Sequence, residues 1–295
     1  MIYVICGPTG SGKTETANQL SDLLNAPIIN ADAFQIYKEM NIGTAKISEK
    51  DPYYKRCYLL DIKEPSEDFS VMEYQKLVRE KLQELSKQYK DIVVCGGTGL
   101  YIKAALYDYV FNEEKEEDNS DLEQMSNEEL YELLKQIDEE STKTIHINNR
   151  KRVIRAISFA RNSSLKKSEV IESQKHELLY PSRFLMISPD REKLYENINA
   201  RVDKMVLLGL IDEVKKLLHN YKLSITARAA IGYKEVIDYL ENRLDLNDCI
   251  ELIKKRTRNY AKRQVTFFKN QLPIETFNSG TQLIEQIEKE VKENA

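Results

Sequence analysis

Apolar residues alternate along the chain between short continuous runs and longer segments in which they recur every three or four positions. The short runs predict strands buried on both faces, and the periodic segments predict amphipathic helices. We expect strands at residues 2–6, 27–30, 58–62, 92–95 and 184–187, and helices that begin after residues 12, 70 and 126 or span residues 148–161, 190–208 and 250–268. This alternation is typical of an α/β fold, a parallel sheet flanked by helices.

The pattern changes between residues 112 and 182. Residues 113–123 are acidic and poor in apolar side chains, which indicates a solvated connector. Ser126 and Glu129 then have the spacing of a capping box at the start of a helix. Residues 162–181 are polar enough to predict a loop. The chain is therefore divided into a core, residues 1–111 and 183–295, and a smaller helical insertion domain, residues 112–182.

The composition indicates the size class of the protein and the cellular compartment in which we expect it. Its 295 residues suit one large domain with a smaller appendage, and no apolar run approaches the roughly 20 residues of a membrane helix. A strand begins at the N-terminus, which leaves no room for a signal peptide. The four cysteines form no CxxC pair and there are three histidines, so a zinc site is not expected. We expect a reduced, cytoplasmic protein, with a monomer as the simplest state.

The first predicted strand is followed by residues 7–14, Gly-Pro-Thr-Gly-Ser-Gly-Lys-Thr, which have the spacing GxxxxGK[ST] of a phosphate-binding loop. Glycines allow backbone N–H groups to close around phosphate oxygens, and the start of the next helix adds the positive end of its dipole. Lys13 supplies a cation, and the hydroxyl of Thr14 is a suitable ligand for Mg²⁺. The loop predicts a bound polyphosphate but not the reaction.

Two further segments follow predicted strands and should lie beside this loop, because ligands of open α/β sheets bind at the carboxyl ends of the strands. Asp32 follows the second strand, and its carboxylate could act as a general base, support Mg²⁺ or cap the next helix. Thr98 is the one side chain of the turn at residues 96–99 that can hydrogen-bond a phosphate oxygen. The three glycines of this turn fit either a close ligand or a tightly packed neighbouring segment.

Basic residues gather in two helices, although the formal net charge of the chain is −4. No acid lies between residues 254 and 269, where Lys255, Arg258 and Lys262 fall opposite the apolar face. Such a helix suits a polyanionic partner. The helix at residues 148–161 has a similar basic edge, made of Arg150, Lys151, Arg152 and Arg155. A basic helix face is most often only solvated.

Three kinds of phosphate chemistry fit these residues. A small-molecule kinase would hold ATP on the loop and use Asp32 as base, a switch or motor NTPase would couple the loop to movement, and a group transferase would hold a leaving pyrophosphate. The NTPase is disfavoured because the sequence has no Asn-Lys-x-Asp motif and the later buried strand ends in Gly-Gly rather than an aspartate. The kinase is disfavoured because a small substrate does not need the basic helix.

Short blocks spread in order over nearly the whole chain resemble the bacterial tRNA dimethylallyltransferases, also called tRNA isopentenyltransferases. The blocks are GPTGSGKT at 7–14, DAFQIY at 32–37, MNIGTAK at 40–46, LLDI at 59–62, GGTGLY at 96–101, KRVIRA at 151–156, RVDKM at 201–205, AIGYKE at 230–235 and TRNYAKRQ at 257–264. This combination is far more specific than the phosphate loop alone, and it implies a P-loop NTPase-like core.

The resemblance implies that the loop binds dimethylallyl diphosphate with Mg²⁺. It implies that N6 of a flipped-out adenine, at position 37 next to the anticodon of tRNA, attacks the allylic carbon while pyrophosphate leaves. Asp32 would be the base at N6, and Thr98 would stabilise the transferring group. The residues implied to hold the donor are Gly7, Pro8, Thr9, Gly10, Ser11, Gly12, Lys13, Thr14 and Arg201, with Thr14 on the metal. Those implied to contact tRNA are Asp32, Ala33, Phe34, Gln35, Lys151, Arg152, Arg155, Arg258, Lys262 and Arg263.

The chain departs from the family pattern at a few positions. Cys57 and Tyr58 replace a usual pair of histidines, Asn197 stands where an arginine is common, and Phe267 and Lys269 replace a usual Trp and Arg. The missing arginine would remove one contact to the diphosphate. Prenyl transfer to a free adenine nucleotide remains the nearest alternative, and a small-molecule kinase is the more distant one.

Overall fold

The computed structural model describes residues 1–111, 119–163, 166–173 and 175–293, and it forms two compact units. One is Met1–Tyr107 with Leu178–Ala295, and the other is Asp108–Glu177. The insertion predicted at 112–182 thus begins and ends too late. The reason is local pairing: Leu178 bridges Tyr107, and the N–H of Leu179 donates to the carbonyl of Leu106 at 2.8 Å, which returns the chain to the first unit before the next strand.

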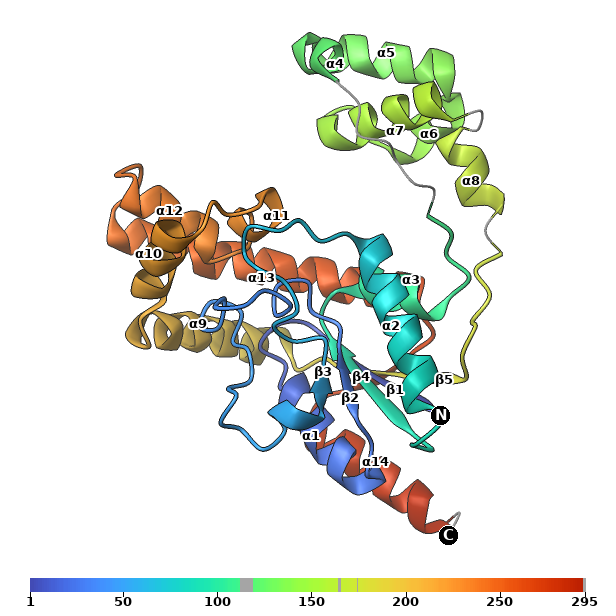
Figure 1. Cartoon of the computed structure of the whole chain (residues 1–295), viewed down its shortest axis with the longest axis vertical. Helices are drawn as coiled ribbons and strands as arrows, with labels where there is room; N and C mark the ends of the chain where they lie inside the picture. Colours follow the sequence, from blue (N-terminus) through green and yellow to red (C-terminus); the bar gives the residue numbers. More distant parts are fainter. Residues whose placement is uncertain (112–118, 164–165, 174, 294–295) are drawn as a thin grey trace. The chain divides into compact units, whose positions relative to one another are not determined.

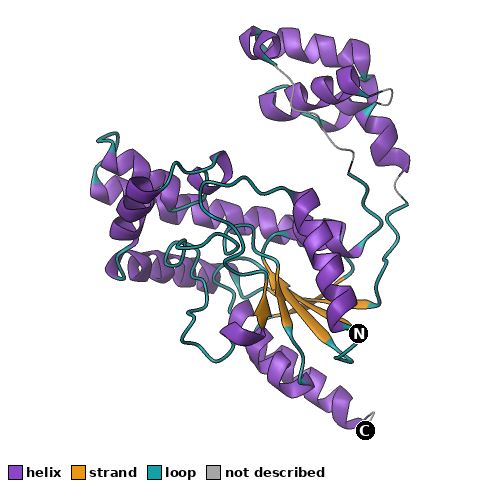
Figure 2. Cartoon of the chain, viewed as in Figure 1, coloured by secondary structure: helices purple, strands orange, loops and turns teal. Residues whose placement is uncertain are grey.

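The first unit is built on a six-stranded parallel sheet with strand order β3-β2-β4-β1-β5-β6 (Figures 1 and 2). The strands are β1 (Ile2–Cys6), β2 (Ile28–Asn30), β3 (Cys57–Tyr58), β4 (Ile92–Gly96), β5 (Ser182–Ile187) and β6 (Ile274–Phe277). The buried apolar runs therefore identified four of the strands closely. They missed β6, in which only Phe277 is buried, because a partly covered edge strand carries a weak apolar signal.

The strand predicted at residues 58–62 is wrong beyond Tyr58. Leu59 and Asp61 have left-handed backbones, with φ of 64° and 53°, so the chain turns away from the sheet. The Asp61 carboxylate instead accepts hydrogen bonds from Lys46 Nζ at 2.5 Å and from the hydroxyl of Tyr54 at 2.8 Å. The Lys46 side chain of this ion pair is fully buried. The pair holds Asp61 away from the sheet, in a segment that the apolar pattern had assigned to a strand.

Helices cover both faces of the sheet. A smaller apolar cluster on one face includes residues of α1 (Lys13–Leu24) and α14 (Gly280–Glu293), which contact each other. The larger cluster on the other face includes residues of α2 (Val71–Leu85), α3 (Gly99–Leu106), α9 (Arg191–Leu207), α10 (Leu210–Asn220), α11 (Ile225–Arg228), α12 (Tyr233–Leu240) and α13 (Leu246–Gln271). Gly209, with φ of 97°, separates α9 from α10. None of the helices in the described ranges is long and apolar enough to cross a membrane.

The second unit is helical and has its own apolar core. Its helices are α4 (Ser120–Gln124), α5 (Asn127–Ile137), α6 (Glu139–Thr144), α7 (Arg150–Asn162) and α8 (Lys167–Ser173). The capping box of Ser126 and Glu129 is confirmed. The connector predicted at 113–123 lies partly outside the described residues, and its end is helical, with Leu122 buried.

The loop predicted at 162–181 is also only partly right, because α8 lies within it. Buried Asp138 accepts hydrogen bonds from the N–H and hydroxyl of Ser168, at 3.1 and 2.6 Å, and thereby fixes the start of that helix. Because these contacts are hydrogen bonds between polar side chains, the sequence shows no apolar periodicity from which α8 could be predicted.

Candidate functional site

The phosphate loop joins the central strand β1 to α1, as predicted. Gly10 and Gly12 have φ of 80° and 87°, a left-handed conformation that favours glycine. Gly12 is the N-cap of α1 and has no side chain to cap it, so the first N–H groups of the helix are available to an anion. Ser11 contributes a buried hydroxyl oxygen that has no hydrogen-bond partner among the described residues. These features suit a loop that closes around phosphate oxygens.

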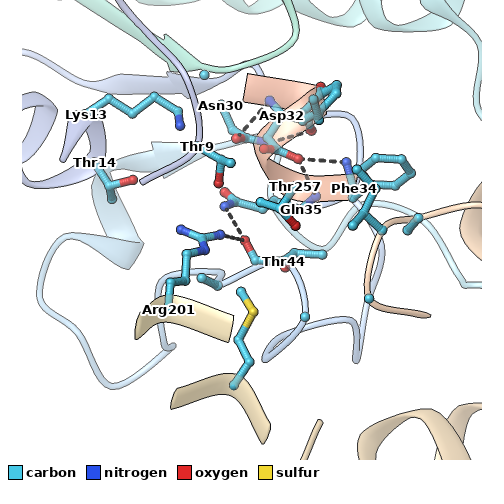
Figure 3. A pocket seen from close by; sticks show the side chains of 18 of the residues that line it. Thr9, Lys13, Thr14, Asn30, Asp32, Phe34, Gln35, Thr44, Arg201 and Thr257 are labelled. Carbon is cyan, nitrogen blue, oxygen red and sulfur yellow. Dashed lines mark hydrogen bonds between the residues drawn. The ribbon is translucent and has the colours of Figure 1, made fainter. Parts of the chain in front are cut away.

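Lys13 and Thr14 begin α1 and both line one cavity (Figure 3). The Lys13 ammonium reaches back to the carbonyl of Pro8, at 3.4 Å. Burial lowers the pKa of Lys13 below the usual lysine range; Arg201 lowers it further, whereas Cys95 and Asp32 oppose the change. A cation in this half-buried position favours binding of a negatively charged ligand, because the ligand offsets the desolvation.

Asp32 follows β2 and lines the same cavity. Its Oδ1 accepts hydrogen bonds from the backbone N–H groups of Phe34 and Gln35, at 2.9 and 3.4 Å (Figure 3). One carboxylate oxygen therefore caps the turn that follows, which was one of the roles open from the sequence. The capped turn holds the carboxylate in place and leaves Oδ2 for a ligand, so the capping role and a chemical role are compatible.

Thr98 precedes α3 and is tied to the segment after Asp32. Its hydroxyl accepts a hydrogen bond from the N–H of Ala33 at 3.1 Å, and its side chain lies near the hydroxyl of Tyr260. Burial raises the pKa of Tyr260 to about 12, so this phenol stays protonated near neutral pH. Thr98 is absent from the residues that line the cavity in the described part of the chain. The structure therefore places Thr98 where it supports Ala33.

The glycines around Thr98 make room for protein rather than for a ligand. A Cβ built at Gly96 would lie 2.1 Å from the carbonyl oxygen of Ala31, and one at Gly99 would lie 2.3 Å from the ring of Phe267. The turn is thus pressed against the end of β2 and against α13. Of the two interpretations that the sequence left open, close packing of neighbouring segments is the one that these contacts support.

Arg201 from α9 completes the cationic side of the cavity. Its Nη2 donates to the carbonyl oxygen of Thr44 at 3.2 Å, and Gln35 Nε2 donates to the same oxygen, also at 3.2 Å (Figure 3). Burial lowers the pKa of Arg201, and Asp32 opposes that shift. One carbonyl therefore orients a residue predicted for the donor and a residue predicted for the acceptor.

The cavity has a volume of about 300 Å³, and it lies in the first unit at the carboxyl ends of the strands. Charged and polar groups from Lys13, Asp32 and Arg201 share it with an apolar wall. The wall residues include Ile47, Val202, Met205, Ile231 and Ile253. A space of this kind accommodates a small phosphorylated molecule that also has an apolar part.

Sequence reasoning missed Tyr260 and Gln264 as site residues, although both lie in a quoted block and line the cavity. It also gave no role to Asn197, whose side-chain amide donates to the carbonyl of Gly10 at 3.2 Å. The residue that replaces the common arginine thus contacts the phosphate loop itself. These roles depend on backbone partners far away in the sequence, which leave no local signal.

The residues predicted to contact tRNA divide between the two units. In the first unit, Ala33, Phe34 and Gln35 follow Asp32, and α13 contributes three basic residues. Lys262 is exposed, Arg263 lines the cavity with its guanidinium 5.6 Å from the ring centre of Tyr260, and half-buried Arg258 donates to Asn199 Oδ1 at 2.6 Å. In the second unit, α7 exposes Lys151, Arg152 and Arg155.

A parallel sheet with a phosphate loop after its central strand, and a cavity at its carboxyl edge lined by Lys13 and Arg201, defines a P-loop-like α/β protein. Comparison with known proteins specifies the family. A family model described as IPP transferase matches residues 35–271. The chain is 43% identical over 297 residues to the tRNA dimethylallyltransferase of Bacillus licheniformis, covering 98% of this chain and 95% of that protein.

Solved structures give the same result. The chain matches a tRNA isopentenylpyrophosphate transferase from Staphylococcus epidermidis with a TM-score of 0.72 and 34% identity, over 100% of this chain and 99% of that one. It matches a eukaryotic dimethylallyltransferase acting on tRNA with a TM-score of 0.78 and 27% identity, over 93% of this chain and 73% of that one. The chain belongs to the IPP transferase family.

Proposed function

We propose that the protein transfers a dimethylallyl group from dimethylallyl diphosphate to N6 of the adenine at position 37 of tRNA and releases pyrophosphate. The observation that carries the proposal is the shared cavity, in which a phosphate loop with two cations faces one carboxylate and an apolar wall. Relatives named tRNA dimethylallyltransferase support the same activity.

The donor diphosphate would bind to the phosphate loop, between Lys13 and Arg201. Both cations belong to half-buried residues that line the cavity, so a diphosphate gains more from them than it would from fully solvated side chains. They would also stabilise the negative charge that develops on the leaving pyrophosphate. The apolar wall would receive the five-carbon prenyl group.

Mg²⁺ fits the donor set at this loop. The Thr14 hydroxyl lines the cavity at the start of α1, and Mg²⁺ is commonly held by few protein ligands together with phosphate oxygens and waters. The described residues contain no group of three or more His, Cys, Asp or Glu side chains that could hold a metal by themselves. Thr14 and the diphosphate would therefore hold the ion, which would neutralise charge on the leaving group.

Asp32 would act on the acceptor. As N6 attacks the allylic carbon, a C–N bond forms, the C–O bond to the diphosphate breaks, and the proton from N6 passes to the carboxylate. The two N–H groups that cap Oδ1 hold Asp32 in position, which keeps its geometry fixed during that transfer. Thr98 would act through Ala33, at the start of the segment that carries Phe34.

The tRNA would dock through basic residues that contact its phosphates. Lys262 and Arg263 lie on the helix that borders the cavity, and α7 of the second unit exposes further cations. Phosphate contacts position a nucleic acid without reading its sequence, so the choice of adenine would depend on the cavity. We also propose that the enzyme is a monomer, since one chain supplies the described residues that line the cavity. A cytoplasmic location is proposed because the proposed acceptor is tRNA.

A transfer assay with labelled dimethylallyl diphosphate tests the proposal. Unmodified tRNA with an adenine-rich anticodon loop and AMP are offered separately as acceptors, and ATP hydrolysis is measured in parallel. We expect label on tRNA alone, at the adenine next to the anticodon. Label on AMP alone would contradict the proposal and indicate prenylation of a free nucleotide, whereas phosphoryl transfer from ATP without prenylation would indicate a kinase.

A further inference from the structure

One buried side chain of α13 joins the phosphate loop to the turn that carries Thr98. Gln264 is only 6% exposed. Its Oε1 accepts a hydrogen bond from the N–H of Thr9 at 3.0 Å, and its Nε2 donates to the carbonyl of Gly97 at 2.9 Å. Because the two bonds need opposite ends of the same amide, they fix its orientation. The amide therefore links loops that follow two different strands, β1 and β4.

The surroundings of this amide leave it little freedom. A Cβ built at Gly97 would lie 2.3 Å from Gln264 Nε2, so only glycine at that position admits the amide. One turn earlier on the same helix, burial raises the pKa of Tyr260, and the neighbouring side chains of Thr98 and Gln264 oppose that shift. A single turn of α13 thus hydrogen-bonds the phosphate loop and Gly97, and it lies beside Thr98.

The same turn also presents basic side chains. Lys262 is exposed, and Arg263 borders the cavity above the ring of Tyr260. Arg263 and Gln264 are consecutive residues of one helix, so a shift of one requires a shift of the other. A polyanion that binds the basic side chains would therefore act directly on the amide that holds the phosphate loop.

We propose that Gln264 is a positioning residue that couples binding of the acceptor at α13 to binding of the donor at the phosphate loop. The inference rests on the proposed function, because it takes tRNA as the ligand of the basic turn. Removing the amide would leave a half-buried N–H at Thr9 and a buried carbonyl at Gly97 without these partners, so the loop would lose its ordered form. Coupling of this kind is reciprocal, so each ligand should tighten the other by the same factor.

The test measures the affinity for inorganic pyrophosphate by calorimetry, with and without a saturating anticodon stem-loop. The wild type is compared with Gln264→Leu and with the control Gln271→Leu. Gln271 lies at the exposed end of the same helix, where its side chain accepts a hydrogen bond from Lys103 at 2.7 Å. The control makes the same substitution in the same helix, away from the phosphate loop.

We expect the stem-loop to tighten pyrophosphate binding by about 5-fold to 150-fold in the wild type and in Gln271→Leu. In Gln264→Leu, pyrophosphate alone should bind about tenfold more weakly, and the stem-loop should no longer tighten it. The affinity for the stem-loop alone should stay within about twofold in all three proteins, since the basic side chains remain. A wild type without coupling, or a Gln264→Leu variant that keeps it, would overturn the inference.

A second variant covers the case in which Gln264→Leu does not fold. Gln264→Glu keeps an acceptor for the N–H of Thr9 and removes the donor to Gly97, so it should also lose the coupling. Unchanged coupling in this variant would contradict the proposed bridge. If the wild type prenylates AMP and not tRNA, the proposed function fails. Pyrophosphate affinity without RNA still shows whether Gln264 holds the phosphate loop.

Discussion

The hydroxyl of Tyr233 donates a hydrogen bond to Glu213 Oε1 at 2.6 Å, and the same carboxylate accepts the backbone N–H groups of three consecutive loop residues. Those donors are Asn41, Ile42 and Gly43, at 3.1, 2.7 and 3.2 Å. Glu213 on α10 and Tyr233 on α12 therefore fix the loop immediately before Thr44. The position of the carbonyl that orients Arg201 and Gln35 depends on this carboxylate.

Glu213→Gln should weaken donor binding without removing any group that contacts the donor. The amide cannot accept all four hydrogen bonds, so the loop at residues 41–44 becomes less ordered and Arg201 loses a fixed partner. We expect the KM for dimethylallyl diphosphate to rise about tenfold, with a loss of about 1–3 kcal/mol in the free energy of unfolding. Steady-state kinetics and denaturant unfolding measure the two effects.

Asp212→Asn is a matched control for this prediction. It makes the same change from carboxylate to amide on the neighbouring residue of α10, whose side chain is 83% exposed. Its KM and stability should equal those of the wild type. Equal kinetics in Glu213→Gln and Asp212→Asn would show that the loop does not need the carboxylate.

Asp32→Asn should lower kcat by about 10² to 10⁴, because the substituted residue cannot accept the proton from N6. The asparagine oxygen can still accept the N–H of Phe34, so the turn after β2 should keep its form. Affinities for pyrophosphate and tRNA should therefore change little. Single-turnover prenylation, with binding measured separately, distinguishes a chemical defect from a structural one, and an unaltered turnover would remove Asp32 as the base.

Donor binding should weaken with rising pH earlier than expected for an ordinary lysine. Burial lowers the pKa of Lys13, so in the free protein its ammonium loses the proton at a lower pH. The neutral amine attracts pyrophosphate less, and binding above that pKa must take up a proton. The measurement compares pyrophosphate affinity in the wild type and in Lys13→Met over a pH series. Because pyrophosphate itself titrates identically in both experiments, its contribution is absent from the difference between the two affinities. The difference should shrink as the pH rises; a constant difference would mean that Lys13 stays charged throughout.

Lys262→Ala should reduce the dependence of tRNA binding on salt concentration by about one unit of the logarithmic slope, since one phosphate contact is lost. Lys262 is preferred to Arg258, which already donates to Asn199 and is half-buried. The control is Lys289→Ala, because the Lys289 side chain is 78% exposed on α14, on the other face of the sheet from α13. Equal slopes in the two variants would indicate that Lys262 is only solvated.

Sequence patterns correctly predicted those parts of the fold that depend on residues close together in the chain. The buried runs of β1 and β4 and the contiguous phosphate loop need no distant partner to be recognised, and the structure places them as expected. The prediction of a strand at 58–62 was wrong because Asp61 forms an ion pair with Lys46 instead of continuing the strand. Arg201, Glu213 and Gln264 bond backbone groups far away in the sequence, and a backbone N–H or carbonyl has no residue-type signature. Only the folded chain could identify these contacts.

The order in which the chain is synthesised differs from the order in which the donor site is completed. The phosphate loop is made first, yet β1 lies between β4 and β5, and α1 is covered by α14 at the other end of the chain. Gly280 packs so closely on α1 that a Cβ there would lie 2.0 Å from the hydroxyl oxygen of Thr16. A nascent chain on the ribosome therefore has an uncovered phosphate-loop helix until α14 emerges, so donor affinity should appear only after α14 has packed on α1.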